Sequence, residues 1–312
     1  MDKQNNISLF FAVDENYLPF LSITLDSIIE NCNMKNFYDI YVLNTGINSE
    51  LTNKVEKRLP NNLSIKFVDM TQKLEKFNES LHTRDYYSKT TYYRLFIPEM
   101  FPNLDKALYL DSDIIVLGDI SELYNTDLKN NLVGAIPDSA VQNTPVFIEY
   151  VEKVIGVNKS TDYFNAGILL MNLKEMRKFN FEDKFLNLLK LYKFTVAQDQ
   201  DYLNAICLNR VTYCDYSWNA MPIPNDCCKP AKLNLIHFNM LWKPWIFENT
   251  VYEEYFWKYA KKNPFFEKIL EIQKSYTEER KQASLAGGEA LLKLAKQEAD
   301  STNNYKNKFL NK

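Results

Sequence analysis

Apolar runs and amphipathic stretches alternate along the first 70 residues. Three short apolar runs, at 7–13, 39–43 and 63–68, predict strands that are buried on both faces. Between them, apolar residues recur at helical spacing, at 18–28 and at 49–59. This alternation of strands and helices predicts a parallel α/β sheet covered by helices on both sides.

The middle of the chain continues the pattern. A helix is expected at 90–96, where Pro98 would stop it. Further strands are expected at 107–110, 114–117, 131–138, 163–173 and 232–238, and further helices at 181–191 and 197–207. We expect the sheet portion to end near residue 270, so that residues 1–270 form one domain and residues 271–312 a helical, basic tail.

The composition changes in this tail. Residues 274–312 carry a net charge of +3, against −6 for residues 1–273. We expect a helix here that is broken by Gly287 and Gly288 and followed by a frayed, disordered end. The alternative is a tail that binds weakly to an anionic membrane surface.

The overall composition excludes several classes of protein. Hydrophobic residues make up 46% and charged residues 25%, as in ordinary globular proteins. A net charge of −3 argues against a nucleic-acid binder. We expect no signal peptide and no membrane span, because no apolar run is long enough. With only seven glycines, the chain has no Gly-rich phosphate-binding loop.

The five cysteines include no CxxC pair. Their odd number fits reduced thiols in a cytoplasm. We expect Cys227 and Cys228 to lie in a packed segment or a loop rather than in a metal site.

Two acidic clusters follow predicted strands directly. Asp14, Glu15 and Asn16 follow the first strand, and Asp111 and Asp113 follow the strand at 107–110. In open α/β sheets, ligands bind outside the carboxyl ends of the strands. Carboxylates one residue apart can share a divalent cation whose open side would bind diphosphate oxygens. An Asp-x-Asp pair alone is common by chance, so its position after a strand carries the argument.

A histidine and a lysine follow the last predicted strand. His237 closes the apolar run, and Lys243 lies between Trp242 and Trp245. A lysine held in this way suits a phosphate oxygen. The alternatives are a histidine packed in the core and a solvated lysine beside a tryptophan-rich loop.

Three further stretches could contribute to a site. The small residues at 165–167 would let a backbone approach a ligand, or they simply begin a strand at a turn. The polar residues at 198–201 open a helix, where Asp199 or Asp201 could simply complement the helix dipole. Arg94 lies on a buried helix and needs an anion, either a structural carboxylate or a substrate phosphate.

Taken together and in this order, these stretches resemble the bacterial members of glycosyltransferase family 8, the galactosyl- and glucosyltransferases that build lipopolysaccharide and related surface glycans. The stretches lie between residues 11 and 245 and are "FAVDENY", "TTYYRL", "LYLDSDIIV", "FNAGILLMNL", "QDQDYLN" and "HFNMLWKPW". The resemblance implies a GT-A fold, a Rossmann-like fold of nucleotide-diphospho-sugar transferases. It also implies retaining transfer of glucose or galactose from a UDP-sugar with Mn²⁺, in whose place Mg²⁺ could serve.

The resemblance also implies roles for single residues. Asp111, Asp113 and His237 would bind the metal ion. UDP would contact Ala12, Asp14, Asn16, Tyr17, Arg94, Asp111, Ser112 and Lys243, with Tyr17 stacking on the base and Lys243 neutralising the diphosphate. The donor hexose would contact Asp138, Asn165, Ala166, Asp199 and Gln200, and the last two would be the catalytic residues.

Retention could arise from double displacement, which needs a carboxylate nucleophile. Position 200 carries an amide, so we favour front-face attack, in which the departing phosphate takes the proton of the acceptor. Two other functions stay open. A nucleotidyltransferase acting on sugar phosphates would normally need a Gly-rich N-terminal loop, and a non-catalytic sugar-nucleotide-binding protein would need no intact site.

The chain departs from the family pattern at two places. The loop at 82–89 is its own, and Met240, Leu241 and Trp242 fill the space where the family often carries a glycine before the lysine. Both departures leave the acceptor open between a glycan, a glycolipid and a glycoprotein. We expect a cytoplasmic protein, attached peripherally at most to the inner face of the membrane, with no nucleic-acid partner; an oligomer is an open alternative.

Overall fold

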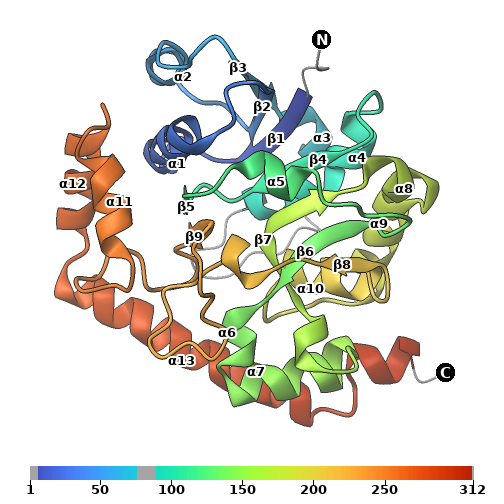
Figure 1. The fold of residues 1–312 in the computed structure, drawn as a ribbon. Coiled ribbons are helices and arrows are strands. Elements are labelled where there is room, and N and C mark those ends of the chain that lie inside the picture. The colour runs from blue at the N-terminus through green and yellow to red at the C-terminus, as the bar shows by residue number, and fades with distance from the viewer. Residues whose placement is uncertain (1–5, 76–88, 311–312) are drawn as a thin grey trace.

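The computed structural model describes residues 6–75 and 89–310, so residues 82–88 of the acceptor-side loop lie outside the described part. A seven-stranded sheet forms the centre of the molecule (Figure 1). Its strands lie in the order β3 (Leu63–Asp69), β2 (Phe37–Asn44), β1 (Asn6–Ala12), β4 (Ala107–Leu110), β7 (Phe164–Met171), β6 (Val133–Pro137) and β8 (Val211–Tyr213).

The sheet is mostly parallel. β1 pairs in parallel with β2 and β4, β2 with β3, and β6 with β8. β7 runs antiparallel to both of its neighbours, β4 and β6. A second, two-stranded sheet pairs β5 (Ile114–Val116) antiparallel with β9 (Leu235–His237). The predicted α/β architecture is therefore confirmed.

Helices surround this sheet on both faces. Up to β6 they are α1 (Leu18–Asn31), α2 (Ser49–Glu56), α3 (Thr71–Glu75), η1 (Lys89–Phe96), α4 (Ile97–Met100) and α5 (Ile120–Tyr124). Between β6 and β9 lie α6 (Ser139–Gln142), α7 (Pro145–Tyr150), η2 (Val151–Ile155), η3 (Ser160–Asp162), α8 (Leu173–Lys178), α9 (Phe181–Leu191), α10 (Asp199–Ile206) and η4 (Tyr216–Trp218). The chain ends with α11 (Glu253–Ala260), α12 (Phe266–Ser275), α13 (Glu278–Asp300) and η5 (Lys306–Leu310).

Two hydrophobic cores lie on the two faces of the sheet. Alternate residues of a strand point to opposite faces, so Phe10 belongs to one core while Leu9 and Phe11 belong to the other. The first core is completed by η1, α9 and α10, and the second by α1, α11 and α12. Because both faces are covered, the central strands are apolar throughout, which is why the sequence shows them as continuous apolar runs.

Two details go beyond what the sequence predicts. The helix η1 ends at Phe96, as expected, but Pro98 lies in the first turn of a new helix, α4, where its missing N–H group costs nothing. The short strand β8 is absent from the predicted set, since its sequence, Val-Thr-Tyr, is too short to form an apolar run.

The C-terminal segment is more ordered than the sequence predicts. α13 runs without a break through Gly287 and Gly288, and it packs along α7 (Figure 1). Its buried residues Leu291, Ala295 and Ala299 recur every four positions and form one face. The expected break and frayed end are therefore wrong for residues 278–310, because burial of this face stabilises the helix. Among the described helices, none has the length and apolar character that a membrane crossing requires.

The two glycines of α13 offer a direct test of the continuous helix. A Cβ atom added at Gly287 would meet nothing within 4 Å, whereas one added at Gly288 would lie 2.8 Å from Cδ1 of Leu241. We expect Gly287→Ala to raise the free energy of unfolding by about 0.5–1 kcal/mol, since alanine favours a helix over glycine. Gly288→Ala should gain less, because Leu241 has to move. Urea denaturation measures both; a destabilising Gly287→Ala would contradict the continuous helix.

Candidate active site

A single pocket collects the residues that the sequence singled out. It opens where β1, β4 and β6 end, and all of the predicted site residues except Asn16 line it. Asn16 is exposed in the turn after β1, outside the pocket. Since β7 is antiparallel to β4, its first residues lie at the same edge, and this brings Asn165 and Ala166 to the carboxyl ends of the parallel strands.

Three side chains in this pocket form a group that could hold a metal ion. The ligand atoms of Asp111, Asp113 and His237 all lie within 4.8 Å of one another. The Nε2 atom of His237 is 3.7 Å from Oδ2 of Asp111 and 3.4 Å from Oδ1 of Asp113. These three residues come together because β9, which ends at His237, pairs with β5, and β5 directly follows the Asp-Ser-Asp loop.

The imidazole is oriented toward the carboxylates. Its Nδ1 atom lies 3.0 Å from the amide oxygen of Asn219, and this contact turns Nε2 toward Asp111 and Asp113. This Nε2 atom is buried and has no hydrogen-bond partner among the described residues. A buried nitrogen without a partner costs stability unless an ion completes it. Two carboxylates and one such nitrogen therefore fit a divalent cation.

Gly167 makes room for this group. A Cβ atom at this position would lie 2.4 Å from Cε1 of His237 and 2.7 Å from Oδ2 of Asp111. Any larger residue would displace two of the three candidate ligands. The sequence predicted that the small residues at 165–167 let a ligand approach the backbone. At position 167, it is the side chains of His237 and Asp111 that approach it closely.

Lys243 balances the charge of the acidic pair. Its ammonium group forms an ion pair with Asp113 and also donates to the carbonyl oxygen of Phe238 at 2.7 Å. Burial by itself would raise the pKa of Asp113, but Lys243 and His237 outweigh it and hold the pKa well below its ordinary range. Asp113 is therefore ionised at neutral pH and available as a ligand.

Arg94 lines the pocket and pairs with two carboxylates. Its guanidinium group is 3.0 Å from Asp199 and 3.4 Å from Asp111, and it also lies 4.4 Å from the ring centre of Tyr109. The sequence left open whether Arg94 faces a structural carboxylate or a substrate phosphate. In the described structure, it pairs with carboxylates of the protein. Burial raises the pKa of Asp199 to about 6, although Arg94 counteracts this shift.

A hydrogen-bond network joins Asp138, Asn165 and Gln200. Oδ2 of Asp138 accepts from the amides of Gln200 at 2.9 Å and Asn165 at 3.0 Å. Oε1 of Gln200 accepts from the backbone N–H of Ala166 at 2.9 Å and from Asn165 at 3.3 Å. The amide of Gln200 is therefore fixed in one orientation.

The remaining predicted residues are held by turns. The backbone N–H of Tyr17 donates to Oδ1 of Asp14 at 3.0 Å, which fixes the turn between β1 and α1. The hydroxyl of Thr24 lies 2.9 and 2.8 Å from the carbonyl oxygens of Ser112 and Ile114 and shares its one proton between them, which ties the Asp-Ser-Asp loop to α1. Asp201, in contrast, is buried and accepts from two tyrosine hydroxyls and the N–H of Ala197, so it supports the start of α10.

Comparison with known proteins identifies the family. The family model described as Glycosyl transferase family 8 matches residues 8–249. The chain belongs to glycosyltransferase family 8.

Relatives and solved structures agree with this assignment. A putative glycosyltransferase of Haemophilus influenzae is 33% identical over 232 residues, 73% of this chain and 67% of the relative. A lipopolysaccharide 1,2-glucosyltransferase of Escherichia coli is 25% identical over 71% of this chain and 64% of its own length.

Among solved structures, the bifunctional glycosyltransferase WbbM has a TM-score of 0.75 and 28% identity over 88% of this chain and 52% of its own. The galactosyltransferase LgtC, solved with donor and acceptor sugar analogues, has a TM-score of 0.71 and 28% identity over 83% of this chain and 96% of its own. The GT-A fold expected from the resemblance is confirmed by these neighbours.

The family pattern did not reveal every residue that shapes the site. Asn219 orients His237, and the Tyr109 hydroxyl donates to Asp111 at 2.9 Å. Tyr109 lies two residues before Asp111, so period-two alternation along the strand could have placed it on the same face. Leu291 of α13 also lines the pocket, and no local signal in the sequence links it to the strand ends.

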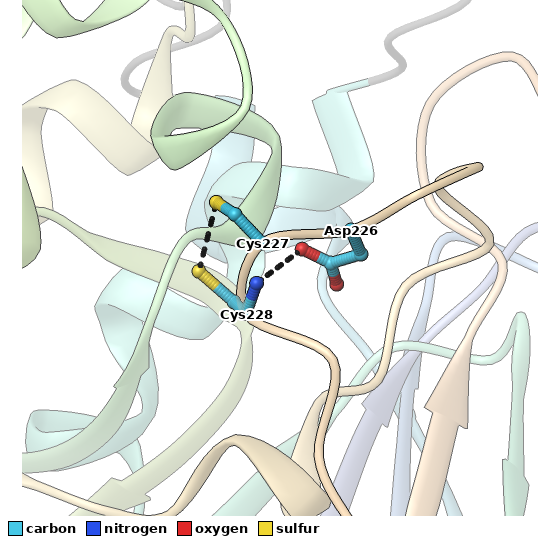
Figure 2. A group of neighbouring side chains, drawn as sticks. All are labelled: Asp226, Cys227 and Cys228. Atoms are coloured by element: carbon cyan, nitrogen blue, oxygen red, sulfur yellow. Dashed lines mark hydrogen bonds between the residues drawn. The ribbon is translucent and has the colours of Figure 1, made fainter.

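A second group of candidate metal ligands lies outside the pocket. Asp226, Cys227 and Cys228 also have ligand atoms within 4.8 Å of one another (Figure 2). They lie on the chain between η4 and β9, in the loop expected from the sequence.

The metal group of this family 8 protein can be tested by binding alone. We expect the protein to bind Mn²⁺ and His237→Ala to weaken binding at least about tenfold, since one ligand of three is lost. Gly167→Ala should act in the same direction because its methyl group displaces two ligands. Electron paramagnetic resonance of free Mn²⁺ measures the affinity. Cys227→Ser is the control; if this variant weakened binding instead, the Mn²⁺ ion would belong to the second group.

Proposed function

We propose that this family 8 protein transfers glucose or galactose from a UDP-sugar to a glycan, glycolipid or glycoprotein acceptor, with retention and with Mn²⁺. The observation that supports this function is the unpartnered Nε2 atom of His237, which faces Asp111 and Asp113 in the pocket. The family membership supports a nucleotide-sugar donor and a glycan acceptor.

The donor would extend along the ends of β1, β4 and β7. Asp14 and Tyr17 line the pocket beside β1 and would hold the nucleoside, with the ring of Tyr17 stacked on the base. Asn16, which does not line the pocket, stays a prediction. Ala12, Ser112 and Arg94 would border the ribose and the diphosphate, and Asp138, Asn165, Ala166 and Asp199 the hexose.

Lys243 would neutralise the leaving diphosphate. Its ammonium group already lies beside the candidate metal ligands, paired with Asp113. A metal ion bound there would supply further positive charge to the phosphate oxygens. Stabilisation of charge that develops during a reaction is usually the largest catalytic contribution.

Gln200 would face the anomeric carbon. In the favoured front-face mechanism, the bond from the anomeric carbon to the diphosphate breaks, the bond to the acceptor oxygen forms, and the acceptor proton passes to the departing phosphate. The role of Gln200 is to steady positive charge at the anomeric carbon through its carbonyl oxygen. The hydrogen bonds from Asn165 and Ala166 hold this oxygen in place beforehand.

The position of the protein in the cell stays a prediction. We expect it in the cytoplasm, where the basic tail could attach weakly to an anionic membrane. In α13, the buried face points inward, so such attachment would have to use its lysines.

A donor screen tests the proposed reaction. We expect the protein with Mn²⁺ to release UDP from UDP-glucose or UDP-galactose, slowly in water alone and faster with an acceptor. Release of pyrophosphate from UTP and a sugar phosphate would instead show a nucleotidyltransferase. Binding of UDP-sugar without any release of UDP would show a non-catalytic binding protein.

Substitutions of Gln200 separate its role from donor binding. We expect Gln200→Ala to lower the rate of transfer much more than the affinity for UDP. Gln200→Glu would place a second carboxyl group about as close to Asp138 as the present 2.9 Å hydrogen bond. The two carboxyl groups repel as anions, so the pKa of the new one should rise, and transfer should recover as the pH falls. Rate–pH profiles of both variants measure this; a covalent glycosyl–enzyme at position 199 or 200 would contradict front-face attack.

A further inference from the structure

The pocket has an apolar wall that the predicted donor contacts do not use. It is formed by Val141, Phe147, Tyr150, Val151, Val196 and Leu291, which line the same pocket as Asp138 and Gln200 and pack in one hydrophobic cluster. The hydroxyl of Tyr150 donates to Asp201 at 2.8 Å, so the polar end of this side chain is already satisfied. The wall therefore offers apolar surface to whatever lies against it.

The donor gains little from such a wall. Its diphosphate is matched by the metal group and Lys243, and its hexose by the amides and carboxylates of Asp138, Asn165 and Gln200. A sugar hydroxyl pressed against leucine or valine loses its hydrogen bonds to water without replacement. The wall therefore suits the acceptor, which reaches the anomeric carbon after the donor is bound.

The C-terminal helix is anchored so that it completes this wall. Lys296 of α13 pairs with Glu149 of α7 at 2.9 Å, and Glu298 accepts from Thr195 at 3.0 Å. Gly288 lies against Leu241, next to Met240, which also lines the pocket. Leu291 is 6% exposed, whereas its neighbour Leu292 is 37% exposed.

From this geometry we propose that the apolar wall is the acceptor subsite and that Leu291 makes α13 part of it. The subsite takes a glycoside that carries an apolar surface beside the hydroxyl to be glycosylated. That surface is either the C–H face of a second sugar ring, attached on the aglycone side, or an apolar aglycone. The inference deepens the proposed transfer reaction and requires it.

Methyl, p-nitrophenyl and octyl glycosides of glucose and galactose, tested as acceptors, distinguish the two kinds of apolar surface. Transfer is followed as acceleration of UDP release with the active donor and Mn²⁺. We expect the wild-type KM for at least one apolar glycoside to be roughly tenfold below the KM for the methyl glycoside. Burial of about two methylene groups gives an effect of this size. A preference for octyl indicates an aglycone, and a preference for p-nitrophenyl a flat ring surface.

Leu291→Ser and Leu292→Ser form a matched pair. Leu291→Ser removes the preference by raising the KM for the apolar glycoside, while the dissociation constant of UDP with Mn²⁺ stays unchanged. Leu292→Ser keeps the preference. Equal KM values for all glycosides in the wild type, or a preference that survives Leu291→Ser, overturn the inference. Absence of UDP release from every donor would instead refute the proposed function itself.

A different observation supports a second inference, at the cysteine pair of Figure 2. The Sγ atoms of Cys227 and Cys228 are 3.7 Å apart. Two thiolates bound to one tetrahedral Zn²⁺ at about 2.3 Å would have their sulfurs about 3.8 Å apart. The pair therefore already has the separation that a shared ion requires.

The backbone around the pair is held in this arrangement. Oδ1 of Asp226 accepts from the N–H of Cys228 at 2.8 Å and from the amide of Asn143 at 2.6 Å. Oδ1 of the same asparagine accepts from the N–H of Cys227 at 3.1 Å. Cys227 is exposed, so an ion could enter and keep a water as its fourth ligand.

We infer that Asp226, Cys227 and Cys228 form a site for a soft divalent cation such as Zn²⁺, separate from the Mn²⁺ group in the pocket. Thiols bind such an ion as thiolates, so binding would release their protons.

Co²⁺ is the probe, because thiolate ligands give it a charge-transfer absorption that oxygen and nitrogen ligands do not. We expect the reduced full chain to show this band at one equivalent of Co²⁺ and to lose it on addition of Zn²⁺. The double variant Cys227→Ser, Cys228→Ser abolishes the band. Cys214→Ser, outside the group, is the control and leaves it unchanged. Absence of the band, or its survival in the double variant, overturns the inference.

Discussion

The pairing of β5 with β9 is the contact on which the candidate active site depends. It places His237 opposite Ile114, one residue after the Asp-Ser-Asp loop. The backbone N–H of Phe238 then donates to the carbonyl oxygen of Asp113 at 2.9 Å, which locks the end of the small sheet to the loop. Without this pairing, the imidazole would have no reason to lie beside the two carboxylates, which are far from it in the sequence.

Charge balance is the second constraint. Two carboxylates at the end of a buried strand are costly unless cations compensate them. Lys243 pairs with Asp113, and Arg94 lies close to Asp111. These two cations come from different parts of the chain, the loop after β9 and the helix η1. The acidic pair therefore ties together two segments that are far apart in the sequence.

The direction of β7 explains how one edge of the sheet gathers the rest of the pocket. Its antiparallel course brings its first residues to the ends of β4 and β6, where Gly167 leaves room for the candidate metal ligands. α13 closes the opposite side by packing on α7. The C-terminal segment thus belongs both to the first hydrophobic core and to the lining of the pocket.

Periodicity alone predicted most of the strands and helices, because the apolar runs of β1, β2, β3 and β4 and the amphipathic helices are local properties of the chain. The ordered set of motifs further indicated which polar residues share a site, and the structure brings all of them except Asn16 to one pocket. The direction of β7 was not predictable, because a strand buried on both faces is apolar whichever way it runs. The helix through Gly287 and Gly288 was not predictable either, because its stability comes from burial of Leu291, Ala295 and Ala299 against α7. Contacts between distant segments decide such features, and no local pattern of residues records them.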